Sequence, residues 1–73
     1  MIVTTKNGKK YLFTIFNNSI RFQIGVQEMV VTDFKDFTVG QKLCVKGYMF
    51  DMYGRTSQEP CLYRSSTPIV SIK

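Results

Sequence analysis

The chain has 73 residues, with ten Lys and Arg against five Asp and Glu, no His and a net charge of +5. A chain of this length forms one small domain, residues 1–73, that buries only about 60% of its unfolded surface. This size excludes a separate cofactor domain. The charge favours polyanionic partners such as nucleic acid or an acidic protein surface, although it also fits solubility alone.

Two strands joined by a tight turn are predicted at the start of the chain. Residues 2–6 are rich in branched side chains, and residues 10–16 combine aromatic and branched ones. Between them, Asn7-Gly8 is a strong hairpin signal, because both residues accept a positive φ. Residues 17–19, all small and polar, predict a second turn.

Apolar and polar side chains alternate over residues 20–27, which predicts a half-buried strand. The inward set is Ile20, Phe22, Ile24 and Val26, and the outward set is Arg21, Gln23, Gly25 and Gln27. A slip of one residue would expose the whole apolar set, so the register is well specified.

The pattern weakens over residues 28–38, where we expect a connector with at most one turn of helix. Residues 29–31 are apolar enough to extend a strand instead. Phe34 and Phe37 are expected to close one end of the core.

Residues 41–52 show the most informative alternation. One side carries Leu43, Val45, Gly47 and Met49, and the other carries Lys42, Cys44, Lys46, Tyr48 and Phe50. Lysines beside aromatic rings suit nucleotide bases over a phosphate backbone. Glycine inside a strand usually marks a bend or bulge, so we expect one at Gly47. A bulge there would turn Tyr48 and Phe50 into the core, and both placements stay open.

Residues 51–60 predict a long hairpin loop, and residues 60–72 a last strand that is interrupted near its middle. Cys44 and Cys61 form no CxxC pair and the chain has no His, so we expect no metal site. We expect both thiols to be reduced in a cytoplasmic protein. The sequence shows no basic leader with an apolar core and no stretch apolar enough to span a membrane.

Five or six short strands with almost no helix predict an all-β fold, a small antiparallel barrel whose closure removes exposed edges. Residues 39–48, Val-Gly-Gln-Lys-Leu-Cys-Val-Lys-Gly-Tyr, resemble the OB-fold, in which a valine-glycine turn precedes an alternating strand broken by a glycine. Residues 68–72 are similar to the closing strand of that family. An SH3-like barrel is the alternative.

The OB resemblance implies a ligand on the face of the second and third strands, flanked by two loops. In this chain those loops are residues 6–10 and 51–60. The candidate nucleic-acid-binding residues are Lys6, Lys9 and Lys10 of the first loop, Tyr53 and Arg55 of the second, and Arg21, Lys46, Tyr48 and Phe50 on strands. The alternative for the lysines is a solvated hairpin tip, and for Tyr53 a ring folded over the barrel end.

The sequence predicts no enzyme and no cofactor, because it offers no nucleophile–base pair and no phosphate-binding glycine loop. We therefore expect a module that binds single-stranded DNA or RNA with low sequence preference. The alternative is a small protein-binding module or inhibitor, of a kind that a phage or mobile element encodes, whose exposed aromatics form a hot spot.

Overall fold

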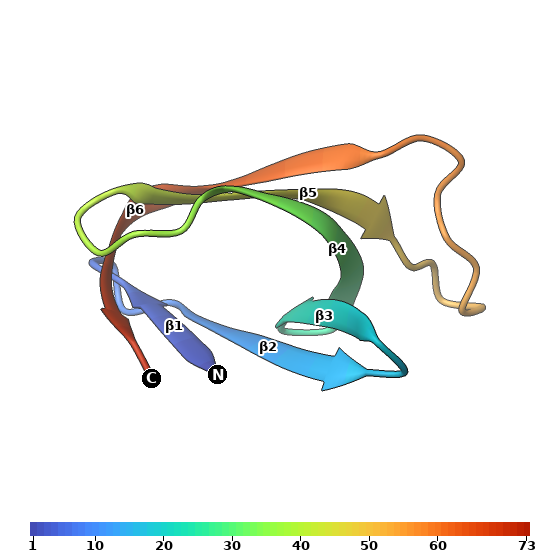
Figure 1. Ribbon diagram of the computed structural model, residues 1–73, viewed down its shortest axis with the longest axis horizontal. Helices are drawn as coiled ribbons and strands as arrows, with labels where there is room; N and C mark the ends of the chain where they lie inside the picture. The colour runs from blue at the N-terminus through green and yellow to red at the C-terminus, as the bar shows by residue number, and fades with distance from the viewer.

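The computed structural model describes residues 1–73 and contains six strands and no helix. The strands are β1 (Ile2–Thr5), β2 (Lys10–Phe16), β3 (Ser19–Ile24), β4 (Gln27–Asp36), β5 (Lys42–Met49) and β6 (Cys61–Ile72). Every pair is antiparallel, and β6 pairs with β1 to close a barrel (Figure 1). The predicted small all-β barrel is confirmed.

The connectivity of the barrel is a meander, in which each strand pairs with the strands before and after it in the chain. The OB-fold is instead a five-stranded Greek-key barrel. The strand order therefore supports a small barrel and adds nothing to the OB resemblance. The structure contains no helix with the length and apolar character needed to cross a bilayer.

Both turns predicted near the start of the chain are confirmed. In the β1–β2 turn, the Thr5 carbonyl accepts a hydrogen bond from the Gly8 N–H at 2.8 Å, and Gly8 has a φ of 85°. In the β2–β3 turn, Asn17 and Asn18 have φ values of 49° and 63°, as a type I′ turn requires.

The predicted strand over residues 20–27 is wrong at its end. Ile24 pairs with Gln27 across a two-residue turn, in which Gly25 has a φ of 56° and Val26 is fully exposed. A glycine at the first central position is typical of the type II′ hairpin turn. Val26 matched the inward pattern by spacing alone.

The predicted connector over residues 28–38 is also wrong, because most of it forms β4. The register of β4 against β5 shifts twice, between Val31 and Asp33 and between Phe34 and Asp36. Each bulge adds one residue and changes the spacing of the inward side chains. This interruption of the period of two explains the weak sequence pattern.

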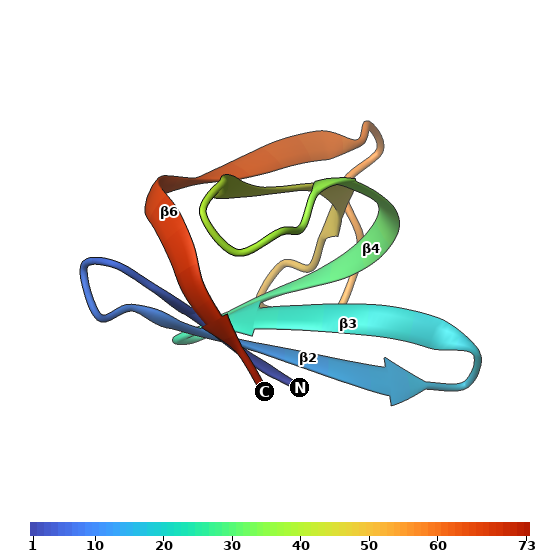
Figure 2. The ribbon, with the colours of Figure 1, turned by 60° about the vertical axis from the view of Figure 1, so that its left-hand side comes forward.

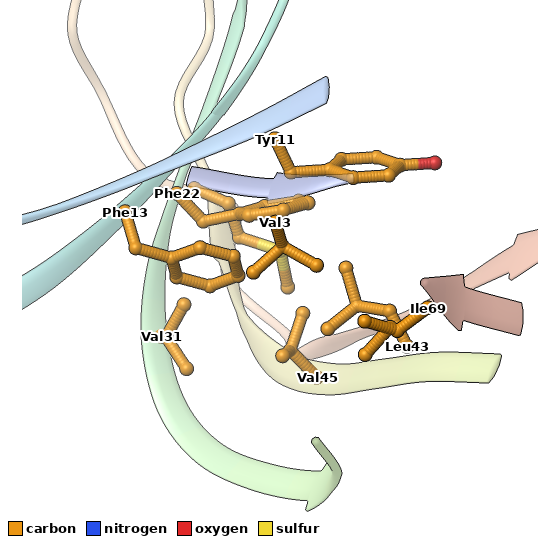
Figure 3. Packing of buried hydrophobic residues seen from close by; sticks show 9 residues of the cluster. Val3, Tyr11, Phe13, Phe22, Val31, Leu43, Val45 and Ile69 are labelled. Atoms are coloured by element: carbon orange, nitrogen blue, oxygen red, sulfur yellow. The ribbon is translucent and has the colours of Figure 1, made fainter. Parts of the chain in front are cut away.

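The core is a cluster of nine buried residues: Val3, Tyr11, Phe13, Phe22, Met29, Val31, Leu43, Val45 and Ile69 (Figure 3). The Tyr11 ring stacks on Phe22 with 5.5 Å between ring centres, and Phe13 lies 4.7 Å from Phe22. Phe34 and Phe37 pack against Phe13 at 5.9 and 5.3 Å, as predicted for the end of the core.

Stability should fall in the alkaline range because of Tyr63. Its hydroxyl donates a hydrogen bond to the Tyr11 hydroxyl at 3.0 Å. Burial, followed by this bond, raises the pKa of Tyr63 well above its ordinary value of 10.0. The unfolded chain then releases this proton at a lower pH than the folded chain. The protonated Tyr63 hydroxyl therefore makes its full contribution to the free energy of unfolding below about pH 10, and this contribution is lost as the pH rises further.

Tyr63→Phe should remove this part of the fall in the free energy of unfolding at alkaline pH. Urea unfolding over a series of pH values measures the effect. Tyr53→Phe, on an exposed ring, is the control. Equal pH dependence of the wild type and Tyr63→Phe would contradict the assignment.

Candidate nucleic-acid interface

The side chains of β5 alternate between the two faces, although Cys44, on the predicted outward side, is buried. Val30 pairs with Tyr48 and Val31 with Gly47, and the bulge next to them lies in β4. Met49 packs against the core, while Tyr48 lies outside it. The outward placement of Tyr48 is therefore correct, and Gly47 lies opposite a bulge without forming one.

We define the β5 stripe as the outward side chains Lys42, Lys46, Tyr48 and Phe50 together with Arg64 of β6. Arg64 joins them because it pairs with Cys44, and side chains of directly paired residues lie on the same face of the sheet. Cys44 itself is almost fully buried. Cys44 and Cys61 form no disulfide. The stripe thus begins with cations and ends with aromatic rings.

The cations of the β5 stripe form no salt bridge. The chain's three salt bridges join Arg21 to Glu28, Lys35 to Asp33, and Arg55 to Asp51. Asp33 pairs with Lys46 in the strand register, but its carboxylate binds the Lys35 ammonium at 2.8 Å. This bond and the charge of Lys35 lower the pKa of Asp33, and the same bond and the charge of Asp33 raise the pKa of Lys35.

Arg21 lies at the aromatic end of the stripe. Its guanidinium carbon is 5.0 Å from the ring centres of both Phe16 and Phe50, within cation–π range. One guanidinium nitrogen, Nη1, donates to Glu28 Oε1 at 2.8 Å, and Nε is buried with no partner. The guanidinium is therefore held by Glu28 and lies against the Phe16 and Phe50 rings.

The two loops predicted to flank one groove lie at opposite ends of the molecule. Residues 6–9 lie at the end where β5 begins, and residues 51–60 at the end where β5 finishes (Figure 1). They do not enclose the outer face of β2 and β3. The expected OB-type groove is therefore absent, because the strand order differs from that family.

Lys6, Lys9 and Lys10, which we call the lysine turn, lie beside the start of the stripe. The Lys6 N–H donates to the Pro68 carbonyl at 2.9 Å, and Pro68 pairs with Lys42 across β5 and β6. All three lysines are exposed and form no salt bridge.

The loop that follows β5 carries the remaining predicted residues. Tyr53 is 74% exposed, so its ring is not folded over the barrel end. The Arg55 guanidinium lies 5.3 Å from the centre of that ring, and its Nε is 3.5 Å from Asp51 Oδ2. This loop therefore presents an aromatic ring and a planar cation together.

Sequence reasoning missed Lys42 and Arg64 of the β5 stripe, and Phe16, which contacts Arg21 beside the stripe. Lys42 shows the same alternation as Lys46 and could have been included. Phe16 and Arg64 reach the stripe through the pairing of β2 with β3 and of β5 with β6, which local patterns do not specify.

The loop after β5 also borders the largest hollow of the surface, of about 700 Å³. Arg21 and Glu28 line it, together with the exposed apolar side chains Val26 and Met52.

Comparison of the chain with protein-family models, with curated proteins and with solved structures finds no match.

Proposed function

We propose that the protein binds single-stranded nucleic acid with low sequence preference along the β5 stripe. The observation that carries the proposal is the order of side chains on one outward face. Lys42, Arg64 and Lys46 come first, and Tyr48 and Phe50 follow. A groove or strip of cations with aromatic platforms is the usual way to hold a single strand.

In this proposal, phosphates contact the three cations of the stripe and bases stack on its two rings. The lysine turn continues the phosphate contacts beyond Lys42, and Tyr53 with Arg55 continues the stacking beyond Phe50. Phosphate contacts carry no sequence information, and every base has a face that can stack. Low sequence preference follows from this chemistry, which uses neither a cofactor nor catalysis.

A single strand fits this surface better than a duplex. The rings need an exposed base face, which a duplex keeps inside its stack. The free thiols of Cys44 and Cys61 fit a reducing, cytoplasmic location.

Binding of a protein partner is the second candidate function. It is favoured by the hollow beside Phe50, whose sides expose Val26 and Met52. Exposed apolar side chains around a charged pair resemble a hot spot with its surroundings. Such binding would tolerate salt, whereas phosphate contacts would not.

The salt dependence of binding to a labelled oligothymidylate, followed by fluorescence anisotropy, tests the first proposal. Six cations, those of the stripe and the lysine turn, should give a slope of log affinity against log salt of about −4. Replacing Lys6, Lys9 and Lys10 with Gln should reduce the slope to about −2. No binding at micromolar protein and low salt would refute the proposal and leave the protein partner.

A further inference from the structure

A second hollow, which we call the polar hollow, lies at the cationic end of the β5 stripe. It has a volume of about 420 Å³ and is lined by Asp36, Gln41, Lys42 and Arg64. All four side chains are polar or charged, and none of them carries an aromatic ring. The polar hollow therefore suits sugar and phosphate groups, whereas stacked bases need the rings at the other end of the stripe.

Strand pairing forms the polar hollow. Asp36 of β4 pairs with Cys44 of β5, and Cys44 pairs with Arg64 of β6. Directly paired side chains share a face of the sheet, so these three form one row. Because neighbouring strands lie about 4.8 Å apart, the backbones at Asp36 and Arg64 are about 10 Å apart. The short, buried Cys44 between them leaves room for a ligand.

The segment that joins β4 to β5, residues 37–41, lies beside β6 (Figure 2). The Gly40 N–H donates to the Ile69 carbonyl, and the Ile69 N–H donates to the Gln41 carbonyl, both at 2.8 Å. These two bonds fix the backbone of the segment to β6. They hold Gln41 and Lys42 at the border of the polar hollow.

The Asp36 carboxylate differs from the other acidic groups near the stripe. Glu28 and Asp33 each bind a cation at 2.8 Å. Asp36 forms no salt bridge, although Lys42 and Arg64 line the same hollow. An ionised carboxylate accepts hydrogen bonds and donates none. The polar hollow thus offers two cations and one free acceptor.

This combination distinguishes RNA from DNA. The two cations attract phosphate, but the carboxylate repels it and needs a donor. The sugar–phosphate backbone of DNA carries only acceptors, so it would leave the carboxylate without a partner. The ribose of RNA adds a 2′-hydroxyl, which can donate and which lies close to the phosphate.

We propose that the polar hollow binds a ribose of single-stranded RNA and that the protein therefore prefers RNA to DNA. The Asp36 carboxylate accepts a hydrogen bond from the 2′-hydroxyl, while Lys42 and Arg64 contact the adjoining phosphates. This inference rests on the proposed binding along the β5 stripe and names its substrate. Every ribonucleotide carries the hydroxyl, so the preference for RNA adds no preference for sequence.

Fluorescence anisotropy with labelled oligouridylate and oligodeoxyuridylate of equal length tests this preference. The two strands share their bases and phosphates, and the dissociation constant should be about tenfold lower for the RNA. A 2′-fluoro oligouridylate, which keeps the sugar pucker of RNA but has no donor, should bind as the DNA does. The ratio of the two affinities should change little with salt, because the phosphate contacts are the same.

Asp36→Ala removes the acceptor and should make the affinities for the two strands nearly equal. Asp36 is exposed, so the variant should fold. Glu59→Ala is the matched control, because it removes the same charge from an exposed residue that forms no salt bridge and lies outside the polar hollow. It should raise the affinity for both strands alike and keep their ratio.

Equal affinity of the wild type for the two strands would overturn this inference and leave the proposed function in place. Failure to bind either strand would overturn both. An Asp36→Ala variant that keeps the full preference for RNA would also overturn the inference, because the preference would then arise elsewhere on the surface.

Discussion

Gly47→Ala is expected to prevent folding. A Cβ at this position would overlap the Val30 carbonyl oxygen and lie 2.8 Å from the Val30 carbonyl carbon and 3.0 Å from the Val31 Cα. All three atoms belong to the backbone of β4, so no side chain can move aside. Relief requires β5 to separate from β4, with a cost of about 4 kcal/mol or more. Small domains have total stabilities of about 5–15 kcal/mol.

Circular dichroism and urea unfolding measure this effect, with Gly54→Ala as the matched control. Gly54 has a φ of 78° and nothing within 4 Å of an added Cβ. Its replacement therefore carries only backbone strain, about 1–2 kcal/mol. If Gly47→Ala unfolds at the same urea concentration as Gly54→Ala, the close approach of the two strands is not as described.

Replacing Lys42, Lys46 and Arg64 together with Gln should cause a large loss of nucleic-acid affinity. Each phosphate contact to a single strand releases about 0.7 of a counterion. Three lost contacts then reduce affinity about 500-fold at about 50 mM salt and about 30-fold at about 200 mM. Fluorescence anisotropy of a labelled oligothymidylate at both concentrations measures the loss.

Lys35→Gln is the control for net charge, because the Lys35 ammonium already binds Asp33 at 2.8 Å. This variant should change the affinity far less than any single replacement in the β5 stripe. Equal losses per charge at Lys35 and in the stripe would show that binding follows overall charge and not this surface.

Local patterns predicted the parts of the fold that depend on local chemistry. The turns at Asn7-Gly8 and at residues 17–19 follow from residues that accept positive φ. The alternation over residues 42–50 separated the core side of β5 from its outward side, except at Cys44, which is buried. These features need no knowledge of the partner strand.

The errors arose where pairing with a distant strand decides the structure. The bulges of β4 are fixed by its register with β5, so period-two spacing failed over residues 28–38. Val26 fits a longer strand by its spacing, but the positive φ of Gly25 forms a turn there. The positions of the two basic loops depend on strand order, which an assumed family connectivity predicted incorrectly.

The candidate site, like the fold, could be predicted only in part from local patterns. Tyr48 and Phe50 were assigned to one face by spacing, with their exposure open. The contacts of Arg21 with Phe16 and Phe50 join residues from three parts of the chain. Only the assembled barrel brings them together.

Mapping of backbone amide shifts by NMR during titration with oligothymidylate tests the central claim most directly. We expect the largest shifts at Lys46, Tyr48 and Phe50, with smaller ones in the lysine turn and at Tyr53, and all should shrink as salt is added. Absence of shifts, or shifts that are independent of salt and lie away from the β5 stripe and the lysine turn, would contradict binding along the β5 stripe.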